Sequence, residues 1–266
     1  MKTVSIIGCG NMGGAIASAL AQSGSWSLTL YDIDKDRASA LGLPVADRIE
    51  DAIKASDIVI LAIKPQVIGE LYDTISEYNE KSYISILAGV PLEVLEYKID
   101  SDNIARFMPN IAARARKAVT AIAFCESADE DFRASAFEIA SSFGSAFILR
   151  ESLFPAFIGL SGSGIAYVFQ FIHALAMGAV EQGIPYPRAV EIAADTMESA
   201  YALVKDTGRN PVELASMVCS AAGTTIKGMN ALSGNGFDNA VVKAVEAATH
   251  RSIELEKTAL ERKDND

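Results

Sequence analysis

The sequence predicts an α/β fold with a doubly wound sheet, followed by an all-helical domain. Three observations predict this fold. A strand-like run from Val4 to Ile7 leads directly into a glycine-rich turn and an apolar helix. Strand-like and helical segments then alternate up to about Arg150, as in sheets covered by helices on both faces. Beyond Arg150 only long segments of helical periodicity remain, so we expect domains at residues 1–150 and 151–266.

Composition narrows the classes of protein to which the chain can belong. Half of its 266 residues are hydrophobic and 21% are charged, which suffices for a large buried core. A net charge of -11 argues against a nucleic-acid partner, because phosphates need a basic face. The three cysteines, Cys9, Cys125 and Cys219, are dispersed and lack metal-site spacing. We therefore expect reduced thiols, no metal site, no signal peptide and a cytoplasmic location.

The glycine-rich turn reads Gly8-Cys9-Gly10-Asn11-Met12-Gly13, which matches Gly-x-Gly-x-x-Gly between a strand and a helix. In this context the pattern is the dinucleotide-binding fingerprint of the Rossmann fold. Gly8 permits the tight turn, Gly10 leaves room for the phosphates, and Gly13 lets the helix pack on the strand. Asn11 and Met12 are expected at the rim of the dinucleotide site, where the helix N-terminus offers unpaired amides to an anion. The turn predicts a bound dinucleotide.

An acidic residue follows the second strand-like run. Residues 28–31 end in Asp32, about 20 residues past the glycines, where a carboxylate can accept both hydroxyls of an adenosine ribose. This placement favours NADH over NADPH. Two alternatives stay open: Lys35 or Arg37 could meet a 2'-phosphate instead, and Asp32 could simply cap the next helix.

The apolar run 57–62 is typical of a parallel strand covered on both faces. Lys64 and Pro65 follow it, and Pro65 suits the first turn of a helix at the strand end where such sheets bind ligands. Ser127 and Glu130 have capping-box spacing, which predicts a helix from there through about residue 143. Further strands are expected at residues 83–86, 104–108, 119–124 and 146–149.

Residues 152–180 carry no charge and are long enough to span a bilayer on length alone. Pro155, Gly159 and Gln170 interrupt the apolar pattern, and its flanks lack a basic cluster. We expect a buried helix at a domain centre or a subunit interface, and no membrane span. The helical domain is more apolar than one subunit needs, which predicts a homodimer.

The second informative stretch runs from Cys219 to Ile226. It places Ser220, Gly223, Thr224 and Thr225 at the expected start of a helix. Exposed amides and hydroxyls at such a start can bind a carboxylate without a basic residue. The alternative is an ordinary capped helix start.

Five motifs follow one another along the chain. They are Gly8-Cys9-Gly10-Asn11-Met12-Gly13, Lys64-Pro65-Gln66, Arg106-Phe107-Met108-Pro109-Asn110, Leu160-Ser161-Gly162-Ser163-Gly164 with Ala166-Tyr167-Val168, and Ser220-x-x-Gly223-Thr224-Thr225. Together they resemble pyrroline-5-carboxylate reductase over nearly the whole chain. The family reduces 1-pyrroline-5-carboxylate to proline with NADPH or NADH, and it dimerises through helical domains that can assemble further into rings.

The resemblance implies a role for each matching residue. The carboxylate of the cyclic imino acid would lie on Ser220 and on the amides around Gly223 and Thr224, with Thr225 as the catalytic residue near the imine nitrogen. Residues 64–65 and 108–110 would border the nicotinamide. The implied cofactor-binding residues are Gly8, Gly10, Asn11, Met12, Gly13, Asp32, Ala62, Lys64, Pro65 and Asn110.

The chain departs from the family pattern near the expected site. Ile165 stands where the family usually has proline, Ala221 and Ala222 replace its usual Pro-Gly, and Ile111 replaces a threonine. Proline is a rigid residue and glycine a permissive one, so their loss at 221 and 222 could alter the path of the loop expected to bind the substrate carboxylate. A basic stretch at 114–117 is either a solvated strand entrance or a new anion contact.

Two rival functions remain open, and the first is a β-hydroxyacid-dehydrogenase-like enzyme or another imine-reducing relative of the same two-domain plan. Residues 223–230 also fit Gly-x-x-x-Lys-x-x-Asn, in which Lys227 would serve as the general acid of a β-hydroxyacid-dehydrogenase-like enzyme. Those dehydrogenases carry this motif on the first helix after the sheet domain, where this chain has no lysine. The other rival is a nucleotide-binding homologue that has lost catalysis.

Overall fold

The computed structural model describes residues 1–263. Its contacts divide the chain into two compact units. The first contains Met1–Gly162 together with the described residues from Ala248 onward, and the second is Ser163–Ala247.

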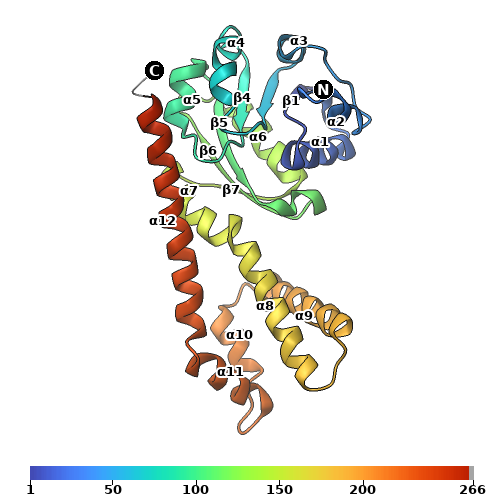
Figure 1. Ribbon diagram of the computed structural model, residues 1–266, viewed down its shortest axis with the longest axis vertical. Coiled ribbons are helices and arrows are strands. Elements are labelled where there is room, and N and C mark those ends of the chain that lie inside the picture. The colour runs from blue at the N-terminus through green and yellow to red at the C-terminus, as the bar shows by residue number, and fades with distance from the viewer. Residues whose placement is uncertain (264–266) are drawn as a thin grey trace. The chain divides into compact units, whose positions relative to one another are not determined.

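The first unit is built on one seven-stranded sheet with the strand order β2-β1-β3-β4-β5-β6-β7 (Figure 1). All seven strands expected from the sequence are present, with shifts of one or two residues at their ends. Reversal of the strand order at β1 is the mark of a doubly wound sheet, which confirms the predicted fold class. The strands are β1 (Thr3–Ile7), β2 (Ser27–Tyr31), β3 (Ile58–Leu61), β4 (Ser82–Ser85), β5 (Ile104–Pro109), β6 (Ala118–Phe124) and β7 (Gly144–Ile148).

One pairing in this sheet is antiparallel. Strands β1 to β5 are mutually parallel, β6 runs antiparallel to β5, and β7 is parallel to β6. The reason lies in the connection between Pro109 and Ala118, which holds only the short 3-10 helix η2 (Ile111–Ala115). A parallel crossover needs a dozen or more residues, so this short link returns the chain in the opposite direction.

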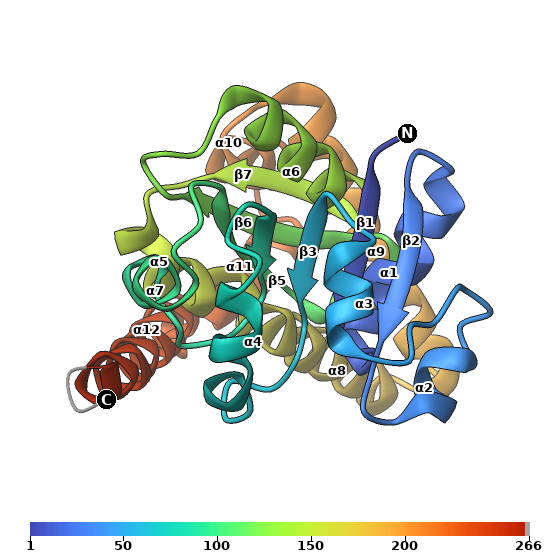
Figure 2. The same cartoon turned by 90° about the horizontal axis from the view of Figure 1, so that it is seen from above.

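Helices cover both faces of the sheet (Figure 2). α1 contacts α6, while α3 contacts α4, which in turn contacts α5. Because parallel crossovers are right-handed, connections that run in opposite directions along the sheet place their helices on opposite faces. The helices of this unit are α1 (Asn11–Ser23), α2 (Lys35–Ser39), α3 (Ile49–Lys54), η1 (Ile68–Leu71), α4 (Tyr72–Ser76), α5 (Leu92–Ile99), η2, α6 (Glu130–Ser142), η3 (Glu151–Leu153), α7 (Phe154–Phe157) and the π-helix η4 (Ile158–Gly162).

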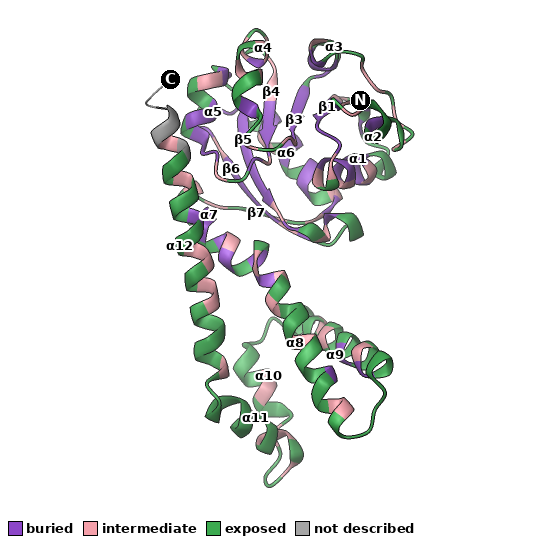
Figure 3. Ribbon diagram, in the orientation of Figure 1, coloured by how far each residue is buried: buried purple, intermediate pink, exposed green. Residues whose placement is uncertain are grey.

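The core of this unit lies along the central strands, which are coloured as buried in Figure 3. All four residues of β3 are buried, as its continuous apolar sequence predicts for a strand covered on both faces. The capping box predicted for α6 is wrong. Asp129 is the N-cap and accepts a hydrogen bond from the N–H of Phe132 at 2.8 Å. The Ser127 hydroxyl instead donates to the carbonyl of Asp102.

The second unit is helical. α8 (Gly164–Glu181) and α9 (Tyr186–Thr207) contact each other and are joined by a short turn. α10 (Pro211–Met217) and α11 (Thr224–Gly234) follow. The last helix, α12 (Phe237–Lys263), begins in this unit and continues into the first, since the division falls after Ala247.

This division differs from the single boundary expected near Arg150. Residues 151–162 belong to the sheet-containing unit, and two side chains explain why. Phe154 is fully buried and Phe157 nearly so, and both pack in the core of that unit. The short helices after Arg150 are thus held by the sheet unit before the long helices begin.

One helical stretch, Glu151–Glu181, is long and apolar enough by length and composition to cross a membrane. One third of its most apolar window is buried within the chain. Several of its large apolar side chains are exposed, among them Val168, Phe169 and Met177. The expected burial at a domain centre is therefore met only in part, and the alternative of burial at a subunit interface stays a prediction.

Candidate functional site

The glycine turn after β1 is as tight as its sequence predicts. Gly8 has a φ of +101°, and a Cβ there would lie 2.7 Å from the carbonyl oxygen of Ala62. A Cβ at Gly13 would lie 1.9 Å from the carbonyl oxygen of Gly8. The first and third glycines are therefore required by close approach of backbone atoms within the chain, and Ala62 at the end of β3 packs against both.

Gly10 differs from its two partners. Its φ of -65° is accessible to any residue, and a Cβ built there would meet no atom of the described residues within 4 Å. The protein itself therefore has no need of glycine at this position. An open space on the backbone, beside a helix start, fits the close approach of a dinucleotide pyrophosphate.

The start of α1 is suited to hold that anion. Gly10 is the N-cap and supplies no side-chain hydrogen bond, so the first amides of α1 lack a side-chain partner. Asn11 and Met12 form the first turn; Asn11 is exposed, and Met12 packs against the core. The unpaired amides and the helix dipole favour a negative group here.

Asp32 lies at the end of β2 and is nearly buried. Its Oδ2 accepts a hydrogen bond from the N–H of Cys9 at 2.6 Å, and its Oδ1 accepts one from the N–H of Asp34 at 2.9 Å. The alternative that Asp32 caps the next helix is wrong, because Asp34 is the N-cap of α2. Asp32 instead connects the end of β2 to the glycine turn through its hydrogen bond with Cys9.

The cations near Asp32 are already paired. Arg37 lies 3.0 Å from the carboxylate of Asp34 and 3.8 Å from that of Asp32. Lys35 instead pairs with Asp47 at 2.6 Å. Two carboxylates therefore face one guanidinium at the end of β2, so this end of the site carries no excess positive charge.

Cys9, between the first two glycines, is not a reactive thiol. Burial, together with the nearby Asp32 carboxylate, raises the pKa of Cys9 to about 11. The thiol is therefore protonated at neutral pH and donates a long hydrogen bond to the carbonyl of Tyr31. Cys9 has a packing role in the turn.

The residues after β3 form a turn. Pro65 does not open a helix as predicted; residues 65–67 are a turn, closed by a hydrogen bond from the N–H of Val67 to the carbonyl of Lys64 at 3.0 Å. Helical structure begins only with the short η1 at Ile68. Lys64 is exposed at the carboxyl end of the strand.

Asn110, directly after β5, has every polar group of its side chain engaged. Its Oδ1 accepts hydrogen bonds from the N–H groups of Ala112 and Val119, and its Nδ2 donates to the Oγ of Ser161 at 3.3 Å. Ser161 is buried in the π-helix η4. Sequence reasoning gave Ser161 no role, although it lies within a motif that carries the family resemblance.

Arg106 on β5 is the largest fully buried side chain and was also missed. Its Nη1 lies 2.7 Å from Glu151 and its Nη2 lies 2.8 Å from Glu256, while its guanidinium stacks on the Phe154 ring at 5.0 Å. Glu151 also accepts a hydrogen bond from the N–H of Leu92. This cluster ties η3, α5 and α12 to the strand that leads to Asn110.

In the second unit, the predicted carboxylate loop forms the start of α11. Gly223 is the N-cap and provides no side-chain hydrogen bond, so the amides of Thr224 and Thr225 are not capped by a side chain. A Cβ at Gly223 would lie 2.2 Å from the Ser220 Oγ, which places that hydroxyl against the helix start. This arrangement favours an anion site over the alternative of an ordinary capped start.

Comparison with known proteins identifies the chain's relatives. A family model described as pyrroline-5-carboxylate reductase dimerisation matches residues 151–255, and one described as NADP oxidoreductase, coenzyme F420-dependent, matches residues 3–89. The chain is 38% identical to the pyrroline-5-carboxylate reductase of Methanosarcina acetivorans, with 96% of this chain and 98% of that one covered. The chain belongs to the pyrroline-5-carboxylate reductase family. The enzyme of this name from Escherichia coli is 34% identical, with 97% and 99% covered.

Solved structures of the family have the same fold. The pyrroline carboxylate reductase of Plasmodium falciparum with NADP bound has a TM-score of 0.86 and 25% identity, with 96% of this chain and 98% of that one covered. The pyrroline-5-carboxylate reductase of Coxiella burnetii has a TM-score of 0.88 and 27% identity, with 96% and 98% covered. The match therefore extends over nearly the whole length of these two reductases.

The departure at Ala222 from the pyrroline-5-carboxylate reductase pattern has a local consequence. Ala222 adopts a φ of +59°, the left-handed conformation that glycine adopts without strain. The loop therefore holds this conformation without the expected glycine, at the expense of strain on an alanine. Ala222 is exposed, so this strain is not offset by burial of its side chain.

Replacement of Ala222 by glycine should therefore stabilise the protein. We expect a gain of about 0.5 to 1 kcal/mol, since the relief of strain exceeds the added entropy of the unfolded chain. Thermal unfolding measures it as a rise in Tm. Ala221→Gly is the matched control, because residue 221 has no positive φ, and this variant should lower Tm. Equal shifts for both variants would contradict the argument.

Proposed function

We propose that this protein reduces the cyclic imine 1-pyrroline-5-carboxylate to L-proline with NAD(P)H. The observation that carries the proposal is the uncapped start of α11, with the Ser220 hydroxyl held against Gly223. It supplies amides and hydroxyls for a carboxylate in a chain whose relatives bear the name of this enzyme. The open backbone at Gly10 supports binding of the cofactor.

The proposed reaction requires little acid catalysis by the protein. The reduced nicotinamide supplies a hydride when it is bound, and the imine carbon accepts it while the imine nitrogen keeps its proton. A protonated imine is a good hydride acceptor, so orientation is the main demand on the site. In this proposal, Ser220 and the amides around Gly223 and Thr224 hold the substrate carboxylate. Thr225 is the catalytic residue, with its hydroxyl near the imine nitrogen.

We propose NADH as the preferred form of the cofactor. Asp32 and Asp34 both face Arg37, so a 2'-phosphate added at the end of β2 would meet two carboxylates for one cation. The hydroxyls of an unmodified ribose can instead donate hydrogen bonds to Asp32. Asn11, Met12 and the rest of the glycine turn hold the pyrophosphate in this proposal, and Ala62, Lys64, Pro65 and Asn110 border the nicotinamide.

Steady-state oxidation of NADH and NADPH by the purified protein tests the proposed reaction. We expect rapid turnover of 1-pyrroline-5-carboxylate, and slow or no turnover of a six-membered cyclic imine or of a 3-hydroxy acid in the reverse direction. Turnover of the hydroxy acid alone would favour a dehydrogenase that uses Lys227, which is exposed on α11. Cofactor binding without any turnover would favour the catalytically silent homologue.

Replacement of Thr225 by alanine should lower kcat/KM for the imine roughly tenfold or more, because a hydrogen bond near the reacting nitrogen is lost. The fold should remain intact, which the Tm reports. Thr196→Ala is the matched control, because within the described part of the chain the Thr196 hydroxyl bonds only to the carbonyl of Ile192 on its own helix. An unchanged kcat/KM in Thr225→Ala would remove Thr225 from the mechanism.

We also propose that the protein is a cytoplasmic homodimer that pairs through residues 151–266. Most of the second unit is coloured as exposed in Figure 3, and its exposed residues include many large apolar ones. The dimerisation model of the family matches this part of the chain. Exposed apolar surface of this kind is typical of protein–protein interfaces when it is contiguous. Association of dimers into a ring rests on the family resemblance alone. The exposed apolar residues include Phe169, Tyr201, Leu203, Val218 and Val242.

A further inference from the structure

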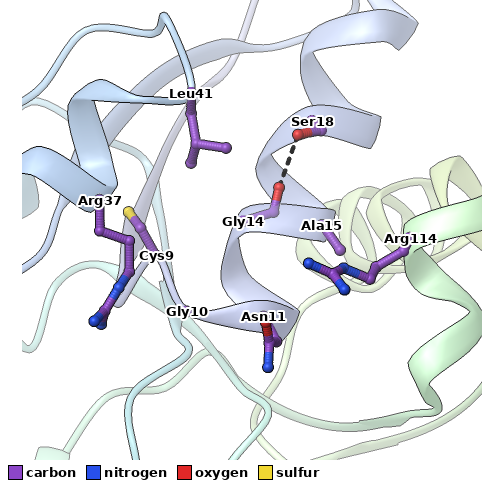
Figure 4. A pocket seen from close by; sticks show the side chains of 9 residues that line it. All are labelled: Cys9, Gly10, Asn11, Gly14, Ala15, Ser18, Arg37, Leu41 and Arg114. Carbon is purple, nitrogen blue, oxygen red and sulfur yellow. Dashed lines mark hydrogen bonds between the residues drawn. The ribbon is translucent and has the colours of Figure 1, made fainter.

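A cavity of about 400 Å³ lies beside the glycine turn (Figure 4). Gly10, Asn11 and Ala15 line it from the first turns of α1, and two arginines reach it from opposite sides. Arg37 comes from α2, and Arg114 comes from η2, the short helix after β5. In Figure 4, the Arg114 guanidinium points toward Ala15 on α1, whereas Arg37 lies on the Cys9 side of the cavity.

The two arginines differ in how their charge is balanced. Arg37 is paired with Asp34 at 3.0 Å and lies 3.8 Å from Asp32. Among the described residues, the guanidinium of Arg114 has no hydrogen bond or ion pair. In a chain of net charge -11, Arg114 is thus an uncompensated cation beside the uncapped amides of α1.

The local backbone explains how Arg114 reaches this place. η2 contacts α1, because Asn110 caps η2 and the chain turns back immediately into β6. Arg116 ends η2 with a φ of +53°, and neither Arg116 nor Lys117 lines the cavity. Of the three cations in the basic stretch 114–117, only Arg114 lines the cavity beside the glycine turn.

We propose that Arg114 binds the pyrophosphate of the nicotinamide cofactor, together with the first amides of α1. A guanidinium can form paired, charge-assisted hydrogen bonds with phosphate oxygens. Because both forms of the cofactor contain the pyrophosphate, Arg114 acts on NADH and NADPH alike. This inference rests on the proposed use of a nicotinamide cofactor. Of the two interpretations of residues 114–117, it favours the anion contact, which Arg114 alone would make.

The test measures the binding of nucleotides to the intact protein without imine substrate. Replacement of Arg114 by alanine should raise the Kd of NADH and NADPH by the same factor, about tenfold, through loss of a charge-assisted hydrogen bond. The Kd of ADP should rise similarly, and that of adenosine should not change. Arg114→Lys should recover part of the affinity for NADH.

Lys117→Ala is the matched control, since it removes the same charge close by in the chain but outside the cavity. It should leave all four Kd values unchanged. An equal loss of affinity in both variants would overturn the proposal in favour of a general field effect. Loss confined to NADPH would overturn it in favour of a 2'-phosphate contact. Because no imine is present, a failure of the proposed reductase activity would leave these results intact.

Discussion

Replacement of Gly10 by alanine is expected to weaken binding of NADH and NADPH at least tenfold, about 1.4 kcal/mol, while Tm stays unchanged. A Cβ at this position meets no protein atom within 4 Å, and its φ of -65° suits alanine. The added methyl group would occupy only the space proposed for the pyrophosphate. Titration of the folded variant with each cofactor measures the effect.

Gly13→Ala is the contrasting variant for this prediction. A Cβ at Gly13 would lie 1.9 Å from the carbonyl oxygen of Gly8, so α1 must move away from β1. We expect Tm to fall, with a loss of about 1 to 3 kcal/mol from overpacking. If Gly10→Ala also lowers Tm, or binds cofactor as well as the parent protein, the open space at Gly10 is not a ligand site.

Replacement of Arg106 by methionine is expected to destabilise the protein by about 3 to 5 kcal/mol. The change leaves the carboxylates of Glu151 and Glu256 without the buried cation that both contact. It also removes the stacking of the guanidinium on Phe154. Thermal unfolding measures the loss, at roughly 2 to 4 °C of Tm for each kcal/mol.

Arg48→Met is the control for Arg106, because Arg48 pairs with Glu50 at a similar distance of 2.7 Å but is exposed. Exposed pairs contribute about 0 to 1 kcal/mol, so this variant should change Tm little. Addition of Glu151→Gln and Glu256→Gln to Arg106→Met should restore part of the stability. Similar losses of Tm in Arg106→Met and Arg48→Met would mean that burial of the Arg106 cluster does not add to the stability of the protein.

The strands and the glycine turn were predictable because their signals are local. The apolar run that became β3 is buried at every position, and the roles of Gly8 and Gly13 follow from the spacing of three glycines. The antiparallel direction of β6 could also have been predicted from the sequence. The link between Pro109 and Ala118 is too short for a parallel crossover.

The features missed from the sequence depend on partners far away in the chain. Arg106 binds Glu151 and Glu256, which lie 45 and 150 positions further on. Ser127 fits the local pattern of a capping box, but its hydroxyl donates a hydrogen bond to the carbonyl of Asp102. Asp129 is the N-cap of α6 instead. Local periodicity carries no information about such long-range contacts, so a sequence pattern alone could not assign them.

The candidate site was predicted in part. The motifs located the glycine turn and the loop before α11, and their local geometry is suited to anions as expected. The loop keeps its helix start despite Ala221 and Ala222, because Ala222 adopts the left-handed conformation. The direction of the Arg114 side chain was left open by the sequence, since it depends on the contact between η2 and α1.

The most direct test of the account compares kcat/KM for 1-pyrroline-5-carboxylate with kcat/KM for 1-pyrroline, the same imine without the carboxylate. We predict rapid reduction of the former to proline and a value at least a hundredfold lower for the latter, about 2.7 kcal/mol, because the start of α11 would have no anion to hold. Equal values for the two imines, or no reduction of the carboxylate-bearing one, would contradict the account.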